Sequence, residues 1–108
     1  MAVKPSHEEI EKEIGIRLSL QRALLTQISP QLRGVAFSVE NQCVCIHFYF
    51  DGPISEDDTE SVSCVETEVI ADYYPELSVS AKSIRLDMPN PMLDGGTWVY
   101  LRREPPED

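Results

Sequence analysis

Three potential metal ligands alternate along one short segment, Cys43-x-Cys45-x-His47. Thiolates and imidazole rings bind zinc, and alternate residues of a strand point to the same face. However, those residues stand ~6.6 Å apart along a strand, whereas the ligands of one zinc ion converge at ~2.0 to 2.3 Å from it. We therefore interpret these cysteines as small residues packed in a strand, and we predict no metal and no other cofactor.

A second candidate for chemistry is the acidic group Asp57, Asp58 and Glu60, which could supply general acid-base catalysis or bind a hard cation. A nucleophile would also need a base and an orienting group, but the only histidines are His7 and His47. The chain has no Gly-x-Ser-x-Gly elbow and no glycine-rich phosphate loop. We therefore predict that the protein is not an enzyme.

The charge of the chain restricts its partners. Nineteen acidic residues against nine Lys and Arg give a formal net charge of -10 over 108 residues. Such a charge repels nucleic acid and anionic membranes, so we expect neither as a partner. It favours a basic protein partner, although a solvated surface without any partner would have the same composition.

The cysteine count and the N-terminal sequence predict the compartment. Three cysteines is an odd number, and Cys43 and Cys45 are too close on one strand for an ordinary disulfide. The first residues lack the apolar core of a secretory signal, and no apolar run is long enough to span a bilayer. We expect a soluble cytoplasmic protein with reduced thiols.

The first half of the chain predicts a helix and a hairpin. Ser6 and Glu9 form a capping box that starts a helix. Gly15 kinks or ends this first piece, and the helix continues or restarts over 16–28 before Ser29-Pro30 stops it. Alternating apolar residues then predict one strand over 33–40 and a second strand that follows the turn and ends at Phe50. A short turn at Asn41-Gln42 joins them into an antiparallel hairpin.

The second half predicts another helix and two strands. Ser55 and Asp58 form a variant capping box for a helix that runs to about Tyr74. Strands follow over 77–86 and 97–103, and a shift in the apolar phase predicts a bulge around Lys82-Ser83 in the first of them. In the second, Trp98 and Tyr100 should face away from Val99 and Leu101.

This order, α-β-β-α-β-β, predicts the α+β class: a two-layer sandwich with both main helices on one face of a four-stranded, mostly antiparallel sheet. We expect a single domain over 1–108, with an acidic N-terminal helical extension over 1–17 and a frayed tail over 104–108.

Two surfaces could then meet a partner. The outer sheet face would expose Tyr49 beside His47. On the second helix a buried apolar stripe should face the sheet, and acids flanking small side chains should face outward. Acids at a helix start are also ordinary helix chemistry, so this face could be simply solvated. The predicted stripe is Val62, Val65, Val69 and Tyr73; the predicted outer face is Glu56, Asp57, Glu60, Cys64, Glu68 and Ala71.

Several motifs from about Leu18 to Arg103 resemble those of small bacterial immunity proteins against colicin-like or contact-dependent growth inhibition toxins. The longer acidic segment 1–17 and the Cys43/Cys45 strand depart from that pattern. The motifs are Leu-Gln-Arg-Ala-Leu-Leu (20–25), Leu-Arg-x-Val (32–35), Phe-Tyr-Phe-Asp-Gly (48–52), Ile-Ser-Glu-x-Asp (54–58), Glu-x-Glu-Val-Ile-Ala-Asp (66–72), Ile-Arg-Leu-Asp (84–87) and Val-Tyr-Leu-Arg-Arg (99–103).

The resemblance implies a non-enzymatic protein that binds and neutralises a cognate toxin domain, expected to be a basic nuclease. An acidic inhibitor of such a toxin would gain electrostatic steering. The predicted contacts are Asp57, Glu60 and Glu68 for attraction at the rim, with Tyr49 or Trp98 as an aromatic anchor.

Two other interpretations stay open. A homodimeric structural or adaptor protein would pair through the outer sheet face or an edge strand. A small-molecule or metal-binding module would need a convergent pocket. Neither has a motif in the sequence.

Overall fold

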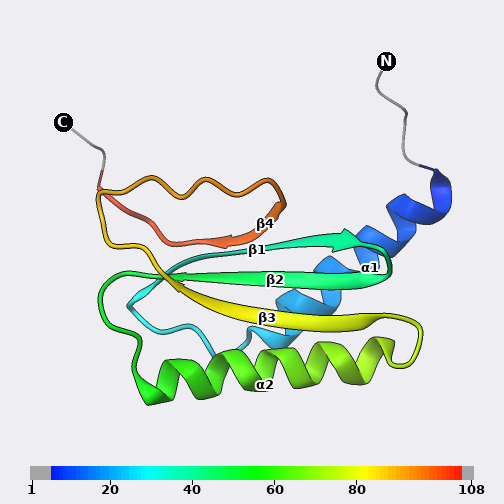
Figure 1. Cartoon of the computed structure of the whole chain (residues 1–108), viewed down its shortest axis with the longest axis horizontal. Coiled ribbons are helices and arrows are strands. Elements are labelled where there is room, and N and C mark those ends of the chain that lie inside the picture. The colour runs from blue at the N-terminus through cyan, green and yellow to red at the C-terminus, as the bar shows by residue number, and fades with distance from the viewer. Residues whose placement is uncertain (1–5, 106–108) are drawn as a thin grey trace.

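Two helices and four strands follow one another in the predicted order (Figure 1). The structure, a computed structural model, describes residues 6–105. The start of the predicted extension, 1–5, and the end of the predicted tail, 106–108, lie outside the described residues. The elements are α1 (His7–Ala23), β1 (Leu32–Glu40), β2 (Cys43–Phe50), α2 (Glu56–Tyr73), β3 (Ser78–Arg85) and β4 (Thr97–Leu101).

Both helix starts follow the predicted capping chemistry. The hydroxyl oxygen of Ser6 accepts a hydrogen bond from the backbone N–H of Glu9 at 3.1 Å, and Ser55 accepts one from Asp58 at the same distance. Helix α1 passes through Gly15 without a break. The expected continuation to residue 28 is wrong, because α1 ends at Ala23 and the chain turns through Thr26, whose φ is +69°.

The hairpin is confirmed in its strands and its turn. Asn41 and Gln42 have φ values of +49° and +64°, and Glu40 pairs directly with Cys43. Two consecutive positive φ angles define a type I′ turn, whose twist matches that of the flanking strands.

The sheet has the order β3-β2-β1-β4. Strand β1 pairs antiparallel with β2 and β4, whereas β3 pairs parallel with β2 across the α2 crossover. The sheet is therefore mixed, with two antiparallel pairings and one parallel pairing. The predicted bulge at Lys82-Ser83 is wrong, because β3 stays in register with β2 from Ser78 to Arg85. The apolar phase changes there because Ile84 lies opposite Tyr49, on the face away from Val79 and Val44.

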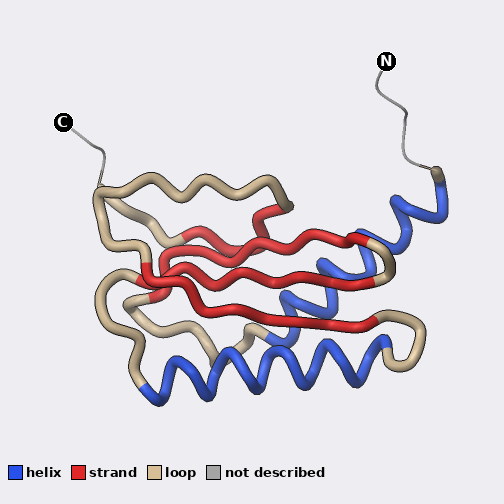
Figure 2. Tube along the Cα trace, in the orientation of Figure 1, coloured by secondary structure: helices blue, strands red, loops and turns tan. Residues whose placement is uncertain are grey.

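Both helices cover one face of the sheet, and the loop between β3 and β4 crosses the other face (Figures 1 and 2). In Figure 1, α2 runs below the sheet, α1 passes behind it, and this loop runs above it. No helix among residues 6–105 combines the length and the apolar character that a membrane span requires. The core includes Ile16, Leu20, Val35, Phe37, Val44, Ile46, Phe48, Val62, Val65 and Val69.

Candidate partner-binding surfaces

Helix α2 carries more acidic residues than any other helix or strand of the structure. Seven of its 18 residues are acidic and none is Lys or Arg. Three of the seven are used by the fold: Asp58 is buried, Glu66 accepts a hydrogen bond from the backbone of β3, and Asp72 pairs with Arg22 of α1. The other four are exposed and make no ion pair with any residue in 6–105; we call Glu56, Asp57, Glu60 and Glu68 the α2 acidic face.

Tyr49 lies beneath the β3–β4 loop. We expected an exposed ring, but Tyr49 is only 6 % exposed. Its hydroxyl donates a 2.6 Å hydrogen bond to Asp94 of the loop, and Nδ1 of His47 lies 2.9 Å from the same carboxylate oxygen. The backbone N–H of Gly96 donates to the other oxygen at 2.7 Å. The strand alternation was right about the face, but it could not show that a loop covers that face.

These contacts shift two titrations in opposite directions. Burial, with help from the hydrogen bond to Asp94, raises the pKa of Tyr49 to about 12. Burial also opposes ionisation of Asp94, but the hydrogen bonds from Tyr49, His47 and Gly96 outweigh it, so the pKa of Asp94 lies below its ordinary value. The loop is thus fixed to the sheet by a buried carboxylate with three donors.

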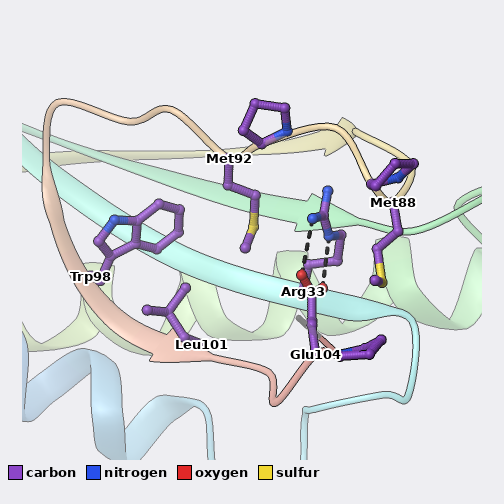
Figure 3. A pocket seen from close by; sticks show the side chains of 9 residues that line it. Arg33, Met88, Met92, Trp98, Leu101 and Glu104 are labelled. Atoms are coloured by element: carbon purple, nitrogen blue, oxygen red, sulfur yellow. Dashed lines mark hydrogen bonds and ion pairs between the residues drawn. The ribbon is translucent and has the colours of Figure 1, made fainter. Parts of the chain in front are cut away.

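Trp98 forms one wall of a shallow hollow of about 300 Å³ on the same face (Figure 3). Its ring centroid is 5.7 Å from that of Tyr49, and the side chain is half-buried. The predicted alternation of β4 is wrong, because a register shift opposite Val35/Ala36 brings Trp98 and Leu101 to one face. Other lining residues are Met88, Pro89, Pro91, Met92, Glu104 and Pro105.

Arg33 closes the base of this hollow, and sequence reasoning missed it. Its guanidinium donates two hydrogen bonds to Glu104, at 2.8 and 3.0 Å, and two more to the carbonyls of Leu86 and Asn90 (Figure 3). Glu104, the first residue of the predicted tail, therefore lies within the fold. By strand alternation Arg33 should share the inner face with the buried Val35, and a charged residue at such a position was the available signal. A register shift between Leu32 and Gly34 turns Arg33 to the outer face.

The three alternating residues considered as metal ligands make other contacts. The Cys43 and Cys45 sulfurs lie 3.9 Å apart, and Nδ1 of His47 is hydrogen-bonded to the Asp94 carboxylate. Burial, followed by the Cys43 contact, raises the pKa of the Cys45 thiol. Within residues 6–105, no group of three or more His, Cys, Asp or Glu side chains is arranged to hold a metal ion.

The five predicted partner contacts therefore fall on two sides of the molecule. Asp57, Glu60 and Glu68 lie on the solvent side of the helical layer. Tyr49 and Trp98 lie on the opposite face of the sheet, one buried and the other half-buried. A single compact interface cannot centre on both groups.

A comparison with known proteins identifies the family. The search of curated proteins gave no match. A protein-family model described as "MafI2 immunity protein" matches residues 13–104, which include every strand, all of α2 and the loop over the sheet. This match covers most of the chain and agrees with the resemblance in the sequence motifs. The chain therefore belongs to the MafI2 immunity protein family.

Proposed function

We propose that this protein binds the toxin domain of a cognate effector inside the producing cell and neutralises it without chemistry of its own. Membership of an immunity protein family supports a role in toxin immunity. The observation that carries the finer proposal is the α2 acidic face, four exposed carboxylates that no cation within residues 6–105 neutralises.

The charge favours a basic toxin, and we propose a nuclease. Nucleases bind phosphate backbones and commonly present Lys and Arg around their active sites. A chain of net charge -10 attracts such a surface at long range and raises the association rate. Covering the active site of the toxin would then exclude its nucleic acid substrate.

The structure changes which predicted residues this proposal uses. Asp57, Glu60 and Glu68 stay as contacts, because they are exposed and without ion pairs in the described part of the chain. Tyr49 is omitted as an anchor, because its ring is buried beneath the loop and its hydroxyl is hydrogen-bonded to Asp94. Trp98 is also omitted, since it lies on the other side of the molecule from the acids.

Co-expression with the toxin encoded beside this protein tests the function directly. We expect cells that produce both proteins to survive and the two proteins to co-purify as a stable complex. Cells that produce the toxin alone should die. Survival without this protein, or death in its presence with the folded protein detected, would contradict an immunity role.

Charge reversal tests the surface. Changing Asp57, Glu60 and Glu68 together to Lys should lower the association rate with the toxin roughly ten-fold at low salt and reduce its salt dependence. Stopped-flow or surface plasmon resonance at several ionic strengths measures both.

Single reversals locate the effect, with Glu40→Lys as the control of equal charge change. Glu40 is exposed at the β1–β2 turn, at the other end of the strands from the start of α2. Equal effects of Glu60→Lys and Glu40→Lys would show that only net charge matters. Unchanged kinetics in the triple variant would reject this surface.

A further inference from the structure

Helix α1 exposes a row of large apolar side chains. Ile10, Ile14 and Leu18 are spaced four residues apart and are 42 %, 53 % and 59 % exposed, and Leu25 beyond the helix end is 68 % exposed. We call these four residues the α1 stripe. With Ile28 they make up five of the eight large apolar side chains that are exposed among residues 6–105. Exposed apolar residues are ordinary when scattered, but a contiguous row indicates a binding surface.

The α1 stripe is not part of the hydrophobic core. The core-facing residues of α1 are Ile16, Leu20 and Ala23, which are buried. At 100° per residue, Ile14 and Leu18 lie on the opposite side of the helix from these residues. No residue among 6–105 covers the stripe, so it is accessible to a second molecule.

The stripe and the α2 acidic face belong to the same side of the molecule. The two helices touch where Ser19 and Arg22 contact Asp72, with an Arg22–Asp72 distance of 3.1 Å. Leu18 is one helical turn from Arg22, and Glu68 is one turn from Asp72. The α1 stripe thus comes close to Glu68, at the C-terminal end of the α2 acidic face.

The edges of the stripe are also acidic. Glu11 and Glu13 flank its N-terminal half and are exposed, although Glu11 lies 3.0 Å from His7 and Glu13 accepts a hydrogen bond from Thr97 at 3.3 Å. Of the cations on α1, Arg22 pairs with Asp72, whereas Arg17 donates to the backbone carbonyl of Trp98 and Lys12 makes no ion pair within residues 6–105.

Two hollows open beside the stripe, between α1 and β4. One, of about 260 Å³, is lined by Ile10, Ile14, Phe37 and Thr97 among others, and the other, of about 330 Å³, by residues that include Leu25, Ile28, Val99 and Tyr100. Side chains of a partner lying along α1 could enter both.

We propose that the basic toxin domain docks on this helical side, with the α1 stripe at the centre of the interface and the acids of both helices at its rim. This inference rests on the proposed function. Charge complementarity selects a cationic protein as the occupant, because the chain has a net charge of -10 and the unpaired carboxylates of the α2 acidic face lie on the same side of the molecule as the stripe. The apolar centre supplies affinity, whereas the acids supply steering.

The test is a double variant, Ile14→Gln with Leu18→Gln. Glutamine has a high helix propensity, and neither position belongs to the hydrophobic core. We expect the toxin to bind this variant roughly 30- to 100-fold more weakly, mainly through faster dissociation. The control is Leu93→Gln with Leu101→Gln, two side chains that are 84 % and 55 % exposed on the loop side of the sheet. The control should bind like the wild type.

The outcomes separate this inference from the proposed function. Wild-type binding that the stripe variant retains in full would overturn the inference and leave the immunity role intact. A wild-type protein that neither binds nor neutralises its toxin would overturn both. Light scattering of the isolated proteins adds a third result: a wild-type dimer that the stripe variant dissociates, with toxin binding unchanged, would show that a second copy covers the stripe and would also overturn the inference.

Discussion

Asp94 determines what one face of the sheet presents to solvent. Its carboxylate accepts hydrogen bonds from Tyr49 and from the backbone of Gly96, and it pairs with His47. The alternation of β2 correctly predicts that His47 and Tyr49 share a face. It cannot predict burial, because the covering residue lies 45 positions further along the chain from Tyr49.

Replacing Tyr49 by Phe should lower the free energy of unfolding at neutral pH by about 1.5 to 3 kcal/mol, the usual value of a hydrogen bond to a charged group. It should also change how the free energy of unfolding depends on pH in the alkaline range. The folded pKa of Tyr49 is raised from 10.0 to about 12, so its contribution is fully present below pH 10 and is lost as the pH rises towards 12. Tyr49→Phe should lack this loss.

Urea unfolding from neutral pH to pH 12, followed by the fluorescence of Trp98, the only tryptophan, measures both effects. Tyr74→Phe is the control, because Tyr74 is 74 % exposed. Identical pH profiles for Tyr49→Phe and the wild type would contradict the burial of this hydroxyl.

Register shifts determine which side chains lie on the loop face, the face of the sheet that the β3–β4 loop crosses. One shift in β1 turns Arg33 outward, and one between β1 and β4 brings Trp98 and Leu101 together. Gly34 of β1 lies directly beneath them. A Cβ added there would meet Cζ3 of Trp98 at 2.8 Å and Cδ2 of Leu101 at 3.2 Å. The absence of a side chain at Gly34 thus allows the indole to lie against the sheet.

Gly34→Ala should therefore destabilise the protein by about 1 to 3 kcal/mol, since the indole and the leucine must move to make room. The emission of Trp98 should shift because its packing changes. Gly95→Ala is the matched control, as no heavy atom of residues 6–105 lies within 4 Å of a Cβ built there. Equal stability of the two variants would contradict the close packing on Gly34.

Local chemistry predicts the elements well but not all of their ends. Ser6, Ser55 and the Asn41-Gln42 turn are correct because each depends on hydrogen bonds or dihedral angles within a few residues. The end of α1 was misplaced because Leu25 and Ile28 extend the apolar pattern without facing the core. The proposed docking surface offers a reason for their apolar character that is independent of the fold.

Over the whole molecule, the α+β class and the element order follow from the sequence, whereas the arrangement of the loop face does not. That arrangement depends on contacts between distant segments, such as Arg33 with Glu104, 71 residues apart. The four residues of the α2 acidic face were identified correctly as exposed because helical periodicity alone places them. The predicted exposure of Tyr49 is wrong, because the β3–β4 loop covers its ring.

The Arg33–Glu104 pair joins three segments of the chain. Arg33 belongs to β1, Glu104 follows β4, and the carbonyls of Leu86 and Asn90, which also accept from Arg33, follow β3. The Arg33 side chain is only 4 % exposed. Its hydrogen bonds to Glu104, against the opposing effect of burial, hold the pKa of Glu104 below its ordinary value.

Glu104→Gln should therefore lower the free energy of unfolding at neutral pH by about 3 kcal/mol, because a buried guanidinium loses its counter-charge. The folded pKa of Glu104 is lowered, so its contribution is present above the ordinary carboxyl pKa and is lost as the pH falls through the folded value. Urea unfolding at neutral and acidic pH should show that the variant loses less stability in acid than the wild type does. Glu76→Gln, at an exposed residue with no ion pair within 6–105, should behave like the wild type. Equal stability of Glu104→Gln and Glu76→Gln at neutral pH would show that the pair does not hold these three segments together.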